Sequence, residues 1–250
     1  MNDGMVTIIL VAVGLVVGCG LGWYGRKSST SRASARRERF FGLPENSECL
    51  VVVNRDASGS DWTVAKHDVF ALVELAAVIK GCGAHLQIVA HDTANQGFGD
   101  RTEFCVGTPI SNRRMAAHMS SLLPGVRINT DPEPGPDRGA FAIGSERYRL
   151  DSGITEHVLL ARLTAGQDAR PVFISCGQRS ITNQAAMRYL ARNEAKLARK
   201  YGNTSFVLLL KVVNSQSYGP DVVELVADVT KAAKAPSPLP SPGKGNGKSV

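Results

Sequence analysis

Residues 171–213 read PVFISCGQRSITNQAAMRYLARNEAKLARKYGNTSFVLLLKVV. The first segment, Pro171 to Gly177, is a short and almost wholly apolar run, which is typical of a strand buried on both faces of a sheet. Helical spacing follows from about Thr182 to Tyr201, and the run from Phe206 to Val213 is apolar enough for a central strand. Strand, helix and strand in this order predict a parallel unit with a right-handed crossover.

The first half of the chain repeats this alternation. The predicted strands are Cys49–Asn54, His85–His91 and Glu103–Gly107, and the predicted helices run from Val64 to Lys80 and from about Asn112 to Leu122. We therefore assign the fold class α/β, a Rossmann-like three-layer sandwich with a mostly parallel sheet.

Shorter segments complete the domain. Three are expected to be short strands of an antiparallel extension, at Ala140–Ile143, Arg147–Leu150 and Val158–Thr164. The stretch Val222–Thr230 alternates only partly between apolar and polar residues, so it is expected to form an edge strand.

An uncharged run of twenty residues, Met5 to Tyr24, precedes the domain. At about 1.5 Å per residue it measures about 30 Å as a helix, the thickness of the hydrocarbon core of a bilayer. Residues 26–39 carry six basic residues and one acidic residue, and basic residues mark the cytoplasmic end of a span. We therefore predict a single-pass protein of the cell membrane, with its N-terminus outside and its domain in the cytoplasm. The alternative is a lipoprotein cleavage box at Val16–Cys19, although the basic n-region of a signal peptide is missing.

Gly14, Gly18 and Gly22 recur four residues apart and so share one face of this transmembrane helix. Small residues at this spacing let two helices approach closely. The sequence therefore predicts self-association of two copies through this face. The alternative is that glycine is simply frequent in membrane helices.

The rest of the chain divides by composition. Residues 1–4 are a short extracytoplasmic N-terminus, residues 25–39 a basic juxtamembrane tether, residues 40–230 the cytoplasmic domain, and residues 231–250 a disordered tail rich in Pro, Gly and Lys. The chain carries a formal charge of +7, but the flanking segments hold the basic excess and residues 40–230 sum to −1. Direct nucleic acid binding is therefore not expected, whereas the tether is expected to contact anionic membrane lipids.

The chain has five cysteines and no C-x-x-C pair. An odd set without that spacing argues against a disulfide framework and against a zinc site, and no metal or cofactor is identified from the sequence. Cys176, at the end of a predicted strand, is a weak candidate for a nucleophile, with His157 or His118 as its base.

Two strand-to-helix junctions resemble each other. Each has a glycine at the end of a strand, a short loop, and then Ile-Ser-Asn or Ile-Thr-Asn at the start of a helix. Glycine permits a sharp exit from a strand, and Ser, Thr and Asn cap the exposed N–H groups of a helix. Helix N-termini attract anions, and ligands of open α/β sheets bind beyond the carboxyl ends of the strands. The junctions therefore predict a site for a small anionic ligand, with a nucleotide as the expected class; the alternative is a pair of ordinary turns.

The predicted ligand-binding residues come from both junctions and from two neighbouring segments. They are Gly107, Ser111, Asn112, Gly177, Thr182, Asn183, Asn54 and Arg101. No P-loop pattern is present, which argues against NTPase chemistry.

Asp100 and Glu103 flank Arg101 directly before a strand, and His91 lies nearby in the sequence. Such a group is a candidate for acid/base catalysis by a hydrolase that acts on a nucleotide. The alternative is a solvated loop with an Asp–Arg pair.

Three functions follow from these patterns. The first is a membrane-anchored domain that binds a small anionic ligand, a nucleotide by expectation, as a sensor or effector. The second is a nucleotide-processing hydrolase that uses Asp100 or Glu103. The third is a membrane-tethered protein–protein scaffold without a ligand.

Overall fold

The computed structural model describes residues 32–54, 63–93, 97–131, 133, 135–166 and 169–236. Within these ranges no helix is both long and apolar enough to span a membrane. The predicted transmembrane run, its glycine face at Gly14, Gly18 and Gly22, and residues 237–250 of the predicted tail lie outside the described residues.

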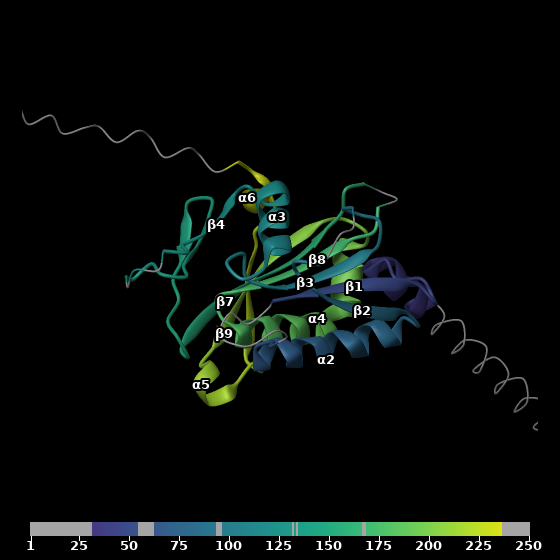
Figure 1. Cartoon of the computed structure of the whole chain (residues 1–250), viewed down its shortest axis with the longest axis horizontal. Coiled ribbons are helices and arrows are strands. Elements are labelled where there is room, and N and C mark those ends of the chain that lie inside the picture. The colour runs from purple at the N-terminus through teal and green to yellow at the C-terminus, as the bar shows by residue number, and fades with distance from the viewer. Residues whose placement is uncertain are drawn as a thin grey trace, which may run out of the picture.

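A seven-stranded sheet runs through the centre of the domain (Figure 1). Its strands are Glu48–Val53 (β1), His85–Ala90 (β2), Thr102–Gly107 (β3), Thr155–Leu163 (β7), Val172–Gly177 (β8), Phe206–Val213 (β9) and Val223–Asp228 (β10). They lie in the order β10-β9-β7-β8-β3-β1-β2. Strands β1, β2, β3 and β8 are mutually parallel and β9 points the same way, whereas β7 and β10 run in the opposite direction. The predicted α/β class with a mostly parallel sheet is therefore confirmed.

Helices cover both faces of the sheet, which gives three layers (Figure 1). One face carries Lys66–Gly81 (α2), Ser180–Tyr201 (α4) and the helical residues 32–41. The other face carries Arg113–Leu122 (α3), Thr230–Lys234 (α6) and a small antiparallel sheet of Val126–Ile128 (β4), Phe141–Ile143 (β5) and Glu146–Tyr148 (β6). A short helix, Ser215–Tyr218 (α5), follows β9.

Strand β1 shows why the central strands are mostly apolar on both faces. Val51 and Val53 pack into the core beneath α2 and α4, whereas Leu50 and Val52 pack into the core beneath α3. Successive side chains of a strand point to opposite faces, so a sheet covered on both sides favours apolar residues at consecutive positions.

Strand β7 differs from its prediction as part of a short extension. It is nine residues long, all but its first residue are buried, and it lies between β8 and β9, antiparallel to both. The other two predicted short strands form β5 and β6 of the separate small sheet. Apolar periodicity identifies a strand, but the choice of neighbours depends on chain direction and on contacts distant in sequence. β10 is an edge strand, as predicted.

Residues 32–39 of the predicted tether belong to a helix over residues 32–41, so the packed domain begins before residue 40, and residues 25–31 lie outside the described residues. Phe40 and Phe41 at its end are fully buried, and the Phe40 ring lies 5.8 Å from Phe173 and 6.2 Å from Phe206 between centroids. Arg37 also forms an ion pair with Glu194 of α4 at 3.0 Å. The segment therefore docks against the domain because its two aromatic rings complete the core beneath α4.

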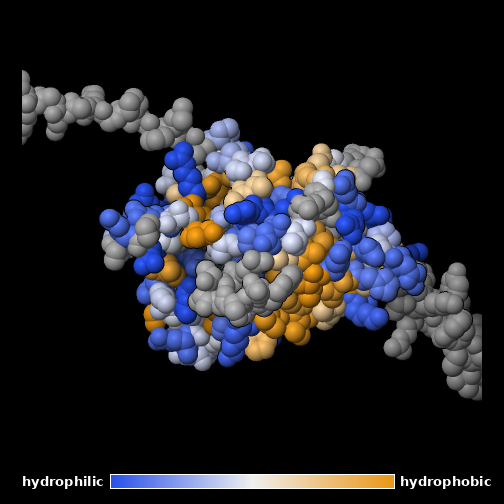
Figure 2. Space-filling view, in the orientation of Figure 1, coloured by the Kyte–Doolittle hydropathy of each residue, from blue (hydrophilic) through white to orange (hydrophobic). Residues whose placement is uncertain are grey.

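Apolar side chains gather on the surface over α2 and the edge strand β2 (Figure 2). The exposed large apolar residues there are Val69, Phe70 and Val73 of α2, and Leu86 and Ile88 of β2. This edge of the sheet is therefore both unpaired within the described chain and apolar.

Candidate functional site

The two similar junctions lie side by side. Gly107, the last residue of β3, pairs with Cys176 of β8, so it is next to Gly177. We call this side of the sheet, where the parallel strands β1, β3 and β8 end, the carboxyl edge. From there α3 crosses to one face and α4 to the other. Open α/β sheets bind ligands where the connections that follow two neighbouring strands leave to opposite faces of the sheet.

The first junction caps α3 as predicted. The side chain of Asn112 accepts a hydrogen bond from the Met115 N–H at 2.9 Å and donates one to the Val106 carbonyl at 3.3 Å. Ser111 contributes less, because its hydroxyl lies 3.0 Å from that of Thr108. Asn112 thus fixes the start of α3 at the edge of the sheet.

The second junction differs from its prediction. Helix α4 begins at Ser180, so Thr182 is inside the first turn, where its hydroxyl donates to the Arg179 carbonyl at 2.7 Å. Asn183 faces the neighbouring helix, and its side-chain amide donates to Asp68 of α2 at 3.0 Å. Gln184 makes a similar contact with His67 at 2.7 Å. These pairs hold the starts of α2 and α4 together at the carboxyl edge.

The two glycines make room for protein side chains. A Cβ atom at Gly107 would overlap the amide group of Asn54, and one at Gly177 would overlap the Thr182 hydroxyl. The backbone at Gly107 also has φ +139°, which side chains rarely permit. Asn54 therefore lies against the end of β3, as expected for a residue of this edge.

An ion pair that sequence reasoning missed lies at the same edge. Glu156 of β7 is fully buried, and its Oε1 accepts hydrogen bonds from Arg179 Nη1 at 2.5 Å and from the Gly153 N–H at 2.9 Å. Because Val158 of β7 pairs with Gly177, Glu156 lies just beyond the end of β8. The signal in the sequence was a charged residue directly before the apolar run that begins at Val158.

Three buried polar atoms at the carboxyl edge have no hydrogen-bond partner among the described residues. They are Asn54 Oδ1, Glu156 Oε2 and His157 Nδ1. Burial also lowers the pKa of His157 below its usual value, which favours the neutral ring. Buried polar groups are nearly always hydrogen-bonded, so we expect a ligand or ordered water to form hydrogen bonds with these atoms.

The predicted catalytic residues are not assembled into one cluster. Asp100 and Glu103 lie at the amino end of β3, where Asp100 accepts a hydrogen bond from the Gly97 N–H at 2.9 Å. His91 follows β2 at the carboxyl edge and lies 3.4 Å from the Arg113 N–H. Arg101 contacts Glu48 at 3.4 Å, at the amino end of β1, so it does not join Asn54 and the junction glycines.

Glu103 belongs to a buried network with α3. Its carboxylate accepts hydrogen bonds from Arg114 at 2.7, 3.0 and 3.2 Å and lies 2.7 Å from His118 Nε2. Burial opposes its ionisation, but the hydrogen bonds from His118 and Arg114 outweigh burial and lower its pKa to about 2. A carboxylate held charged and fully buried is suited to fixing α3 on the sheet, and no observation favours it as a catalytic acid.

Stability is expected to depend on the ionisation of Glu103. Its folded pKa is below the unfolded value of about 4.3, so its contribution is complete above that value and is lost as the pH falls toward about 2. A shift of that size corresponds to about 3 kcal/mol. The difference in unfolding free energy between wild type and Glu103→Gln, measured by urea unfolding, should shrink by about that amount over this window. A difference that stays constant with pH would contradict the assignment.

The cysteine alternative receives no geometric support. Cys176 is fully buried, and burial raises the pKa of its thiol to about 12, so the thiol stays protonated and unreactive at neutral pH. Within the described ranges, no three His, Cys, Asp or Glu side chains are grouped so that they could hold a metal ion.

No protein-family model matches this chain, and a search of curated proteins also gave no match. The chemistry of the carboxyl edge, with its two helix starts, its ion pair and its three unpaired atoms, is therefore the basis for a functional assignment.

Proposed function

We propose that the domain binds a small anionic ligand, with a nucleotide as the favoured class, at the carboxyl edge between β1, β3 and β8. In this proposal the uncharged run from Met5 to Tyr24 anchors the chain in the cell membrane and the domain acts on the cytoplasmic side as a sensor or effector. The observation that carries the ligand proposal is the set of three buried, unpaired polar atoms at the edge.

The proposed ligand follows from the chemistry of these atoms. Asn54 Oδ1 and Glu156 Oε2 are acceptors, so they need a ligand that carries O–H or N–H donors. The starts of α3 and α4 carry partial positive charge, and Arg179 beside Glu156 is 45% exposed, so an anionic group is favoured close by. A nucleotide combines these properties, because its sugar and base supply donors and its phosphates supply the negative charge.

Thermal unfolding of the full chain against a panel of nucleotides tests the proposal. A ligand at 100 times its Kd should stabilise the folded state by about 2.7 kcal/mol. Asn54→Ala should remove most of this stabilisation, because it deletes the acceptor Asn54 Oδ1. The smaller side chain creates no steric clash with Gly107. The matched control is Asp100→Asn at the amino end of β3, which should bind like wild type.

Two results would count against the proposal. A panel in which no nucleotide raises the unfolding midpoint would favour the scaffold without a ligand. Binding that Asn54→Ala leaves unchanged while Asp100→Asn abolishes it would move the site to the other end of β3.

A further inference from the structure

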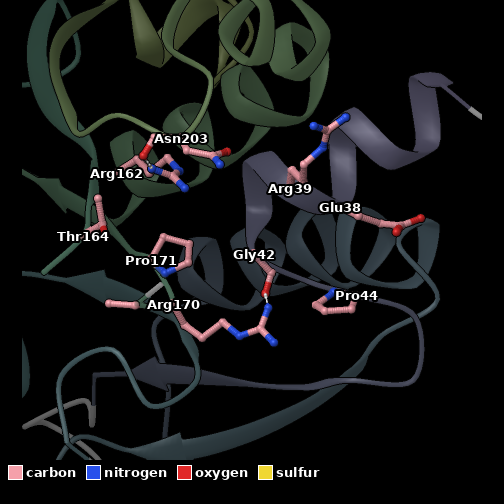
Figure 3. Close-up of a pocket in the computed structure, with 10 residues that line it drawn as sticks. Glu38, Arg39, Gly42, Pro44, Arg162, Thr164, Arg170, Pro171 and Asn203 are labelled. Atoms are coloured by element: carbon pink, nitrogen blue, oxygen red, sulfur yellow. Dashed lines mark hydrogen bonds between the residues drawn. The ribbon is translucent and has the colours of Figure 1, made fainter. Parts of the chain in front are cut away.

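A cavity of about 250 Å³ opens at the end of the sheet opposite the carboxyl edge (Figure 3). Three of the residues that line it are arginines, Arg39 from the helix over residues 32–41, Arg162 from the end of β7, and Arg170 from the segment before β8. Among the described residues of the lining Glu38 is the one acidic residue, so their charged side chains sum to +2. The cavity is smaller than the roughly 300–1,000 Å³ of sites for drug-sized ligands, so it suits a small group.

Arg162 is a buried cation whose charge is not balanced within the described chain. It is 3% exposed, and its guanidinium donates to the carbonyl oxygens of Phe40 at 2.8 Å, Asn203 at 2.6 Å and Thr204 at 3.2 Å. Carbonyl groups satisfy hydrogen bonds but carry no net charge. Burial accordingly lowers the pKa of Arg162 to about 10. A buried charge without an opposite charge is costly, and a bound anion would offset that cost.

The other two arginines keep donors available. Arg170 uses Nη1 to donate to the Gly42 carbonyl at 3.0 Å, and Arg39 uses Nε to donate to the Ala35 carbonyl at 3.1 Å. Glu38 is engaged by the Ser34 hydroxyl at 3.0 Å on its own helix. Each arginine has five N–H donors in a planar fork that matches the oxygens of a phosphate group.

The basic surface continues beyond this cavity. A second cavity of about 490 Å³ shares Arg39 and Asn203 with the first and adds Arg36 and Arg199. Arg32, the first described residue of the helix, follows the predicted membrane span by only eight positions, which reach at most about 28 Å. This end of the domain is therefore the one that the predicted anchor would hold nearest to the bilayer.

We propose that the cavity between Arg39, Arg162 and Arg170 binds a phosphate group, and that the headgroup of an anionic phospholipid supplies it. This site is separate from the carboxyl edge, and it stands whether or not a nucleotide binds there. Its occupation would fix the orientation of the domain on the membrane surface.

The test measures thermal unfolding of the full chain in nanodiscs of phosphatidylcholine, with and without phosphatidylglycerol. A parallel series in detergent adds inorganic phosphate or glycerophosphate at matched ionic strength. We expect phosphatidylglycerol to raise the unfolding midpoint by several degrees. If inorganic phosphate also raises the unfolding midpoint, the result would support the phosphate site. It would show that the site accepts soluble phosphate in addition to the lipid headgroup.

The double variant Arg39→Gln/Arg170→Gln should lose this rise. The matched control is Arg127→Gln, which removes an exposed arginine from β4 on the far side of the domain. This control should retain the rise in the unfolding midpoint. Asn54→Ala at the carboxyl edge should also keep it, so failure of this site is distinguishable from failure of the nucleotide site. No rise in any series, or an equal rise in the double variant and in Arg127→Gln, would overturn the proposal.

A second variant, Glu38→Gln, tests the phosphate site if the double variant does not fold. Glu38→Gln removes the only negative charge among the described residues of the cavity lining and leaves its three arginines in place. The rise with phosphatidylglycerol should then exceed that of wild type. A rise equal to or smaller than that of wild type would refute the site.

Discussion

Replacing Glu103 with alanine is expected to lower the free energy of unfolding by about 3–5 kcal/mol, the range for removing one partner of a buried ion pair. The carboxylate of Glu103 is fully buried and holds Arg114 through three hydrogen bonds, and it lies 2.7 Å from His118. The variant would leave the guanidinium, whose side chain is only 16% exposed, without this partner. Because folded domains are stable by only about 5–15 kcal/mol, such a loss would be a large fraction of the total.

Chemical denaturation of the full chain measures this loss. The matched control is Glu48→Ala, which removes a carboxylate that lies 3.4 Å from Arg101 but is 66% exposed. An exposed pair contributes about 1 kcal/mol or less, so the control should change little. Equal losses in the two variants would show that the Glu103 network does not stabilise α3 on the sheet.

Gly107→Ala is expected to have a comparable effect, about 2–6 kcal/mol. The left-handed backbone at Gly107, φ +139°, should account for about 1–3 kcal/mol once a Cβ is present. The overlap of that Cβ with the Asn54 side chain should add about 1–3 kcal/mol. The measurement is the midpoint of urea unfolding, and the control is Gly166→Ala, where an added Cβ meets no atom of the described residues within 4 Å.

A double variant separates the two causes. In an Asn54→Ala background the overlap disappears, so Gly107→Ala should lose only the part due to the backbone. If Gly107→Ala is as stable as Gly166→Ala, the close packing of Asn54 against the end of β3 is not present in solution.

Prediction from sequence succeeded where the signal was local. The runs Cys49–Val53 and Phe206–Leu210 are apolar at every position because both faces of the sheet are covered, and this alone indicated buried strands between helices. The cap of α3 was predicted at Ser111 or Asn112 from their place before a helical stretch, and Asn112 provides it, because capping involves only backbone groups three residues away. Such interactions are encoded within a few positions of the chain.

Contacts between residues that are distant in sequence were not foreseen. Asn183 is a predicted ligand-binding residue, and its side-chain amide donates a hydrogen bond to Asp68, 115 positions earlier. Glu103 and His91 are candidates for one acid/base cluster from their nearness in sequence, but the strand direction places Glu103 near the amino end of β3 and His91 beyond the carboxyl end of β2. The contacts of a strand residue also depend on the face of the sheet to which its side chain points. Glu103 points to the face that α3 covers, and there it accepts a hydrogen bond from Arg114.

The sequence by itself determined the α/β class, the alternation of buried strands with helices, and the occurrence of two similar glycine junctions, because periodicity and capping are local properties of the chain. Only the tertiary structure decided that β7 inserts between β8 and β9, that Glu156 meets Arg179 at the carboxyl edge, and that Arg39, Arg162 and Arg170 surround one cavity. These arrangements depend on strand order and register, which are fixed by the packing of distant segments against a common core.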